Sequence, residues 1–185
     1  MSIIVAQKLV EASRIIHANP DSNGFGGLDR FGHVGCWIYV PSIDQWFWGQ
    51  SVKLATGKYD HAERAAIKKV LDFLGVRKLP KGCVVISTLE PCSGPVKFRN
   101  GCSCSKLLKQ HGVDTVHVGV RDWIQRDFVT GAWPVHSFKM VMTTDPEAVV
   151  ESKRLFSYLE TWILANKPEV RKFYDQWVNP LPMAP

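Results

Sequence analysis

The chain has 185 residues, 45% of them hydrophobic and 22% charged, and 23 basic against 17 acidic residues give a formal charge of +6. This apolar content is too high for an intrinsically disordered chain, and no run of 18 or more apolar residues exists that could span a bilayer. The apolar start at residues 3–6 ends at Gln7 and Lys8 and lacks the length of a signal peptide. We therefore expect a cytoplasmic protein with no membrane partner.

Hydrophobic periodicity and capping residues predict the secondary structure in chain order. The predicted helices cover residues 3–18, 61–74, 103–111, 145–165 and 168–177. The predicted strands cover residues 33–40, 45–52, 83–89, 115–120 and 138–143. Gly75 is placed as a C-terminal cap, and Asp145 with Pro146 is typical of a helix start.

This order of elements predicts an α/β fold, specifically a three-layer α/β/α sandwich around a central mixed sheet of about five strands. The length suits one domain over residues 1–185. We expect its core at about 30–145, with an N-terminal helix within 1–19 and C-terminal helices over about 145–178.

The cysteines point to a metal or to catalysis. There are five, an odd number and too few for a disulfide scaffold. Cys92, Cys102 and Cys104 fall within one short stretch. The positive charge favours anionic partners such as nucleotides or nucleic acid, although the basic residues do not gather into one run.

His61 and Glu63 open the second predicted helix, and Pro91 and Cys92 follow the third predicted strand. The pattern H-x-E followed by P-C-x-x-C is the signature of zinc base deaminases, and this chain matches it as far as Cys92 but has a longer gap before its next cysteine, Cys102. One imidazole and two thiolates leave a fourth position on zinc for water, whose lowered pKa gives a hydroxide that attacks an amino-bearing ring carbon. A carboxylate must move protons to the ring and to the departing ammonia, and Glu63 is the candidate. His61 and Glu63 can serve one site only at the first turn of a helix, because residues two apart do not share a helix face.

Three stretches resemble the cytidine deaminase-like zinc deaminase superfamily. They are His61-Ala62-Glu63, Thr88-Leu89-Glu90-Pro91-Cys92-Ser93, and the segment 104–112 with the strand that follows it. The resemblance covers roughly residues 30–125, and in motif it is closest to the deaminase domain of the riboflavin-biosynthesis deaminase and reductase. It departs from that family over residues 93–101, so it does not imply that family's phosphoribosyl substrate. A second, reductase-like domain is not expected.

The resemblance also bears on the third zinc ligand. Cys104 lies eight residues before Gly112, as the second zinc cysteine does in the riboflavin-type pattern, whereas Cys102 lies two residues further away. Cys104 is therefore preferred, with Cys102 as the alternative. A closed structural site that uses His61 and all three cysteines is the competing interpretation.

Two segments are predicted to contact the substrate. Phe98 and Arg99 lie between the zinc cysteines, and Trp123 and Arg126 follow the strand after the zinc helix. Aromatic and arginine side chains suit base stacking and phosphate contact. The glycine-rich segment 21–32 is a further candidate for the pocket wall.

The leading hypothesis is a zinc-dependent hydrolase that deaminates a pyrimidine-type base in a free nucleoside or nucleotide. The first alternative is a deaminase of bases in single-stranded DNA or RNA, and the second is a non-enzymatic zinc-stabilised binding domain. An oligomeric state remains open.

Overall fold

The structure is a computed structural model that describes residues 2–18, 33–53, 59–93, 103–127, 130 and 132–178. The α-helices are α1 (Ser2–Ala18), α2 (Ala62–Leu74), α3 (Cys104–Gln110), α4 (Pro146–Asn166) and α5 (Pro168–Trp177). The strands are β1 (Gly35–Val40), β2 (Gln45–Gln50), β3 (Val52–Lys53), β4 (Tyr59–Asp60), β5 (Val84–Leu89), β6 (Thr115–Val120) and β7 (Lys139–Met142). Two short 3-10 helices are η2 (Pro41–Ile43) and η3 (Trp123–Gln125). Within these residues, no helix combines the length and apolar character needed to cross a membrane.

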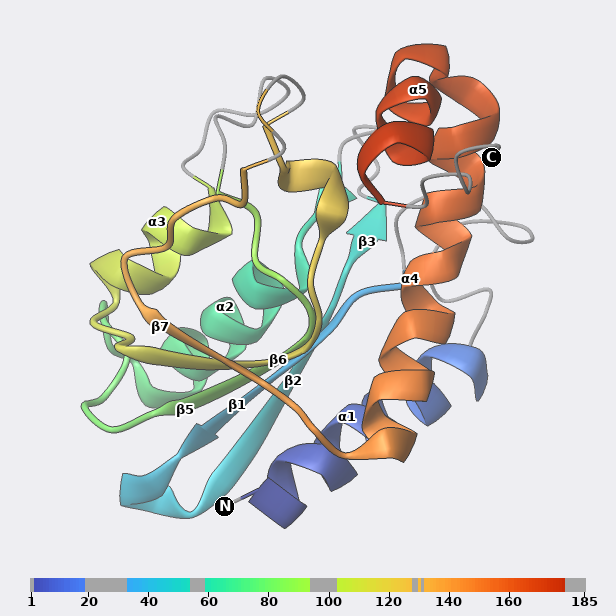
Figure 1. The fold of residues 1–185 in the computed structure, drawn as a ribbon. Helices are drawn as coiled ribbons and strands as arrows, with labels where there is room; N and C mark the ends of the chain where they lie inside the picture. Colours follow the sequence, from blue (N-terminus) through green and yellow to red (C-terminus); the bar gives the residue numbers. More distant parts are fainter. Residues whose placement is uncertain are drawn as a thin grey trace.

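Five strands form one mixed sheet in the order β2-β1-β5-β6-β7 (Figure 1). β1 is antiparallel to both of its neighbours, with Trp37 opposite Trp48 of β2 and opposite Ile86 of β5. β5, β6 and β7 run parallel to one another. The predicted mixed sheet of about five strands is confirmed, and the direction of β7, which the sequence left open, is parallel to β6.

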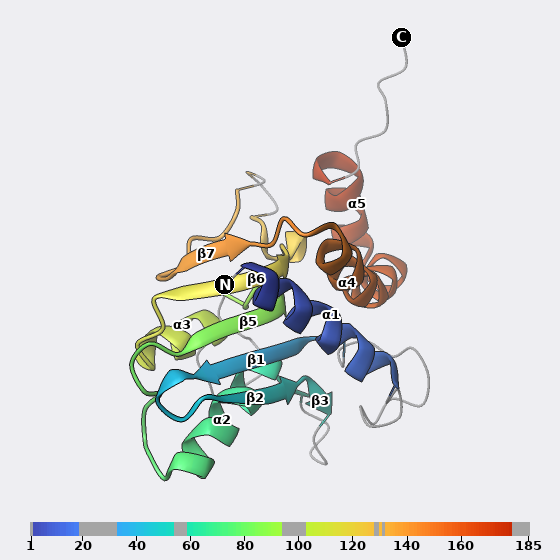
Figure 2. The ribbon, with the colours of Figure 1, turned by 90° about the horizontal axis from the view of Figure 1, so that it is seen from below.

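Helices cover both faces of this sheet, α2 and α3 on one face and α1 and α4 on the other (Figure 2). Because side chains alternate along a strand, β1 contributes to both apolar layers. Ile38 and Val40 pack with Val70 of α2, whereas Trp37 packs with Leu9 of α1. This is the predicted three-layer α/β/α sandwich.

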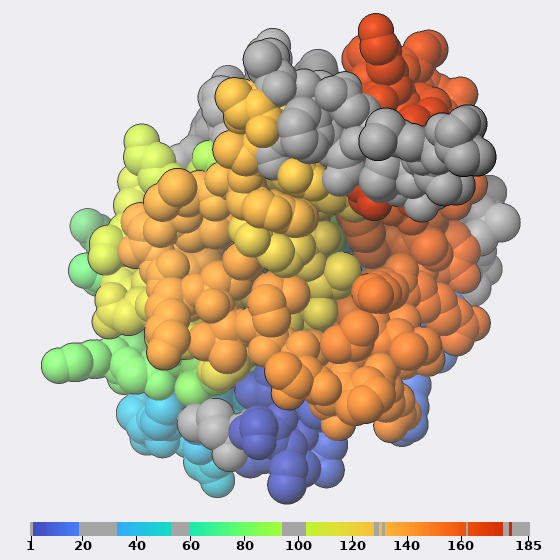
Figure 3. All heavy atoms as spheres, in the orientation of Figure 1, coloured from blue at the N-terminus to red at the C-terminus, as the bar shows by residue number. Residues whose placement is uncertain are grey.

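A third apolar cluster joins the C-terminal helices to the end of the sheet. Trp123 of η3 packs with Phe156 of α4 and Phe173 of α5, beside Leu89 at the end of β5. The indole Nε1 of Trp123 donates a hydrogen bond of 2.7 Å to Glu160. In the space-filling view, the chain from η3 through α4, yellow to orange, forms most of the visible face (Figure 3). The cluster therefore holds α4 next to the strand ends from which the site residues come.

One feature was not predicted. β3 and β4 form a separate two-stranded ladder in which Val52 pairs with Asp60. The second sheet strand ends at Gln50, before the predicted Val52, and Ser51 N–H donates to the carbonyl of Val34 at 3.0 Å. Strands of two residues carry no readable periodicity, so only the folded chain reveals this ladder, which places Asp60 immediately before His61.

Candidate metal centre and active-site cavity

His61 is the residue at which the chain enters α2. Its backbone is extended (φ −85°, ψ 150°), and its side chain makes no capping hydrogen bond to the helix. Asp60 accepts a 3.1 Å hydrogen bond from the His61 backbone N–H, which fixes the entry into the helix. The expectation that His61 and Glu63 stand at the first turn of a helix is confirmed.

The two thiols reach the same place from different elements. Cys92 follows β5, and Cys104 is the first residue of α3, where Ser103 accepts a capping hydrogen bond from Lys106 N–H. Cys104 N–H donates to Cys92 Sγ at 3.2 Å, and Ser105 N–H donates to the Cys92 carbonyl at 3.0 Å. These bonds tie the start of α3 to the chain that leaves β5.

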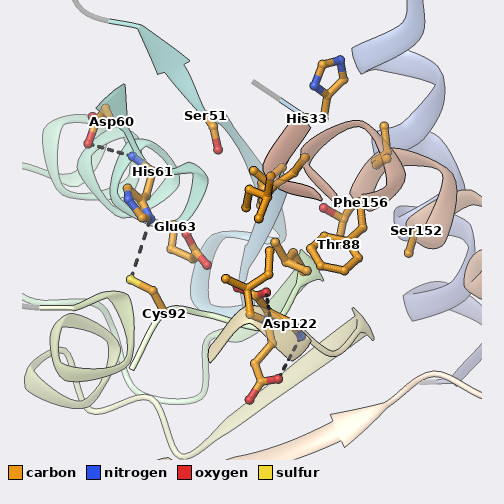
Figure 4. A pocket seen from close by; sticks show the side chains of 17 residues that line it. His33, Ser51, Asp60, His61, Glu63, Thr88, Cys92, Asp122, Ser152 and Phe156 are labelled. Carbon is orange, nitrogen blue, oxygen red and sulfur yellow. Dashed lines mark hydrogen bonds between the residues drawn. The ribbon is translucent and has the colours of Figure 1, made fainter. Parts of the chain in front are cut away.

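His61, Cys92 and Cys104 form one cluster whose ligand atoms all lie within 4.8 Å of one another. Cys92 Sγ lies 3.8 Å from His61 Nδ1, and a dashed line joins these two side chains in Figure 4. Ligand atoms arranged tetrahedrally around zinc are separated by roughly 3.5–3.8 Å, as Zn–S and Zn–N bonds of about 2.3 and 2.0–2.1 Å require. One imidazole and two thiols are also the donor set of a catalytic zinc site. The donor set therefore fits zinc, and the Cys92–His61 pair has the spacing of two zinc ligands.

The thiols of this cluster have unequal pKa values. A hydrogen bond between the two thiol groups, together with His61, outweighs burial and lowers the pKa of Cys92 to about 4. The same hydrogen bond, with burial, raises the pKa of Cys104 well above its usual value. Cys92 is therefore the first of the two thiols to become the thiolate that a metal requires.

Glu63 is the buried carboxyl group beside this cluster. It is 3% exposed and lies in the first turn of α2. Burial, partly offset by His61, raises the pKa of this carboxyl. Glu63 lies close to the sheet because β2 has a glycine, Gly49, at this point. A Cβ on Gly49 would lie 2.2 Å from the carbonyl oxygen of Ala62. The absent side chain lets α2 begin close to the sheet.

A cavity of about 230 Å³ adjoins the cluster, and His61, Glu63 and Cys92 line one end of it (Figure 4). Asp122, which follows β6, also lines this cavity, and burial raises the pKa of its carboxyl to about 7. The opposite wall belongs to α4 and includes Phe156. The cavity therefore has a polar, metal-binding end and an apolar end.

A hydrogen-bond network around Glu90 supports the loop that carries Cys92. The Glu90 side chain is fully buried and receives two 3.2 Å hydrogen bonds from Arg121, and its Oε1 lies 2.7 Å from His136 Nε2. Burial alone would raise the pKa of Glu90, but the hydrogen bonds from His136 and Arg121 outweigh it and lower the pKa. The sequence showed Glu90 only as one letter of a motif. A charged residue directly after an apolar strand was the available signal.

The structure describes only some of the residues that are predicted to contact the substrate. Phe98, Arg99 and Cys102 lie outside the described residues, as do the segments 21–32 and 94–101. Trp123 is 5% exposed in the apolar cluster under α5. Arg126 lies 5.0 Å from the ring centroid of Trp133. Neither Trp123 nor Arg126 lines the cavity, whereas Ile124 between them does. Contact of these residues with a substrate stays a prediction.

Together, the sandwich and the site define an α/β protein with a His-Cys-Cys metal cluster beside a buried glutamate. The family model for the cytidine and deoxycytidylate deaminase zinc-binding region matches residues 28–120, half of the chain. The chain therefore belongs to this zinc-binding deaminase family, and its cofactor is zinc. A search of the curated proteins found no match.

Solved structures share the fold at low identity. One is a diaminohydroxyphosphoribosylaminopyrimidine deaminase/5-amino-6-(5-phosphoribosylamino)uracil reductase from Thermotoga maritima, with 19% identity, a TM-score of 0.54 and 84% of this chain covered. The match spans 42% of that protein's length. Another is the Rib2 deaminase of Aspergillus oryzae, a C-terminal deletion mutant, with 13% identity, a TM-score of 0.50 and 86% of this chain and 98% of that chain covered. These likenesses support the fold.

Proposed function

We propose that the chain hydrolytically deaminates an aminated pyrimidine-type ring in a free nucleoside or nucleotide. The observation that carries this proposal is the position of Glu63, a buried carboxyl group in the same cavity as His61 and Cys92. A closed structural zinc site has no use for such a carboxyl, because all four metal positions are taken by protein ligands.

The three metal-binding residues and Glu63 each have a role in the proposal. His61, Cys92 and Cys104 hold the zinc ion, which when bound supplies a Lewis acid that makes water a better nucleophile. The Cys104 N–H bond to Cys92 Sγ orients that thiolate toward the site. Glu63 would take one proton from the attacking water and pass it to the ring nitrogen, and would then carry the remaining proton of the newly bound hydroxyl to the leaving amine. Ammonia departs, and the ring keeps a carbonyl oxygen.

The cavity favours a small substrate. At about 230 Å³, it lies below the usual 300–1,000 Å³ of ligand pockets, and α4 covers the side away from the metal cluster. We include α1, α4 and α5 in the same functional domain, which would then extend over residues 1–185. Contacts of α4 with α1, β5 and β6 support this grouping.

One observation favours the alternative of a single-stranded nucleic acid substrate. Arg121 and Arg126 both approach the ring of Trp133, at 3.9 and 5.0 Å from its centroid, and Trp133 is 37% exposed. Exposed aromatic and arginine groups serve as stacking platforms for unpaired bases. A substrate screen therefore has to include oligonucleotides.

The test is ammonia release from free bases, nucleosides, nucleotides and single-stranded oligonucleotides, measured for the wild type, Glu63→Gln and Glu169→Gln. Glu169 is an exposed glutamate in the first turn of α5 and serves as the matched control. Proton transfer by one positioned group typically contributes about 10²–10⁴ in rate. Because Glu63 serves several transfers, we expect Glu63→Gln to lose more than about 10⁴ in kcat. Its zinc content and Tm should stay near those of the wild type.

Two results would contradict the proposal. Turnover of Glu63→Gln within about threefold of the wild type removes this residue from the mechanism. Absence of ammonia release from every substrate, in zinc-loaded protein, favours the zinc-stabilised binding domain.

A further inference from the structure

The inference concerns the substituent that the substrate carries, and it rests on the proposed function. The wall of the cavity that faces the metal end is one side of α4 (Figure 4). Its apolar residues recur at helical spacing and are Leu155, Phe156, Leu159 and Ile163. This helix begins at Pro146, beyond the residues 28–120 that match the family model. The chain's own C-terminal part therefore decides what fits at this end.

The described residues that line the cavity offer no cation for a phosphate. They include no lysine or arginine, and their acidic members are Asp60, Glu63, Glu90 and Asp122. Arg121 is already engaged, since it binds Glu90 and lies over Trp133. Burial is the main cause that lowers the pKa of His33, and the charge of His17 lowers it further. This lining histidine therefore adds no charge at neutral pH. Phosphate recognition relies on charge-assisted donors, and the described lining residues include no lysine or arginine to provide them.

Two polar atoms in the lining lack a partner. Ser152 of α4 is 1% exposed, and its Oγ has no hydrogen-bond partner within the described part of the chain. The same holds for Nδ1 of His33. Ser152 lies deep against β6, where a Cβ on Gly119 would come within 2.0 Å of its Oγ. Buried polar groups are normally hydrogen-bonded, so we expect a ligand to supply the partner of each of these two atoms.

From these observations we propose that the substrate is an uncharged nucleoside, without a phosphate. Its aminated ring lies at the metal end, and its sugar packs against Phe156 and hydrogen-bonds to Ser152. A hydroxyl-bearing, neutral substituent satisfies the unpartnered Ser152 Oγ and brings no negative charge toward Glu63 and Asp122.

The first arm of the test uses the wild-type, zinc-loaded chain. It compares kcat/KM for matched sets of free base, nucleoside and nucleoside 5′-monophosphate: cytosine, cytidine and cytidine monophosphate, with the corresponding adenine and guanine sets. In the set that is deaminated, we expect the nucleoside to exceed its monophosphate at least tenfold.

The second arm compares Ser152→Ala with Ser157→Ala. Ser157 lies on the same helix but is exposed, and its hydroxyl donates to the carbonyl of Arg154. Loss of one hydrogen bond should raise the KM of Ser152→Ala for the nucleoside about five- to tenfold and leave kcat/KM for the free base unchanged. Its Tm should not fall, because the lost hydroxyl has no hydrogen-bond partner among the residues that the structure describes. The control should match the wild type throughout.

The outcomes separate the two proposals. A monophosphate or an oligonucleotide deaminated as well as the nucleoside overturns this inference and leaves the deaminase intact. An equal loss of base and nucleoside turnover in Ser152→Ala, with a lowered Tm, assigns Ser152 a structural role and also overturns it. No turnover in any set removes the proposed function itself.

Discussion

Gly49→Ala is expected to damage the active site from a position outside it. The added Cβ would lie 2.2 Å from the carbonyl oxygen of Ala62 and 2.4 Å from the backbone nitrogen of Ala66, whereas real Cβ contacts essentially never fall below 3.0 Å. Both atoms belong to the helix backbone, so no side chain can turn aside. The first turn of α2 must withdraw by about 0.8 Å or more, and it takes His61 and Glu63 with it.

The magnitudes follow from this displacement. Overpacking costs about 1–3 kcal/mol, which lowers Tm by roughly 2–12 °C in a chain of this size. A misplacement of about 1 Å in a catalytic group costs on the order of 10²-fold in rate. We therefore expect Gly49→Ala to remain folded at 25 °C but to lose about 100-fold in kcat/KM. Thermal unfolding and the steady-state rate of ammonia release measure the two effects.

Leu9→Ala is the matched control. Leu9 is 1% exposed and packs on the opposite face of the sheet from α2, so its truncation costs about 2–5 kcal/mol without moving His61. The control should unfold at a lower temperature and keep wild-type kcat/KM below its Tm. Gly49→Ala with wild-type activity, or a Leu9→Ala variant that loses activity in proportion to stability, would refute the reasoning.

Two further predictions concern the metal and the loop beside it. Cys92→Ala and Cys104→Ala should each lose zinc under chelator challenge, whereas Cys102→Ala should retain it. Elemental analysis measures the zinc content. Full zinc occupancy in Cys92→Ala or Cys104→Ala contradicts the proposed ligand set. Glu90→Gln should cost about 3 kcal/mol at pH 7, the lower end of the range for breaking a buried ion pair, because the Glu90 side chain is fully buried whereas that of Arg121 is 30% exposed. Because the folded pKa of Glu90 is lowered, its contribution is present above the unfolded value of about 4.3 and is lost as pH falls through the folded pKa. The difference in the free energy of unfolding between wild type and Glu90→Gln, measured in urea, should therefore narrow below about pH 4. A difference that stays constant with pH contradicts this prediction.

Local patterns predicted the elements of this fold because their causes are local. The helix and strand periods, the cap at Asp145 and the αL glycine after α2 each depend on a few neighbouring residues. The same holds for His61 and Glu63, which line one cavity because the helix starts between them. Cys104 was preferred to Cys102 because its distance from Gly112 matches the riboflavin-type spacing that the sequence resembles, and the structure brings Cys104 to the cluster.

The rest of the site depends on contacts between residues far apart in the chain. The apolar positions 155, 159 and 163 of α4 are typical of an ordinary core helix, and only the packed structure makes them a cavity wall. Ser152 is unremarkable in the sequence, and its unpartnered hydroxyl becomes visible only where α4 meets Gly119 of β6. Side-chain periodicity identifies the face of a helix that is buried but not the surface it faces. The sequence alone therefore determined the class of chemistry, and tertiary packing decided the shape and charge of the space in which that chemistry takes place.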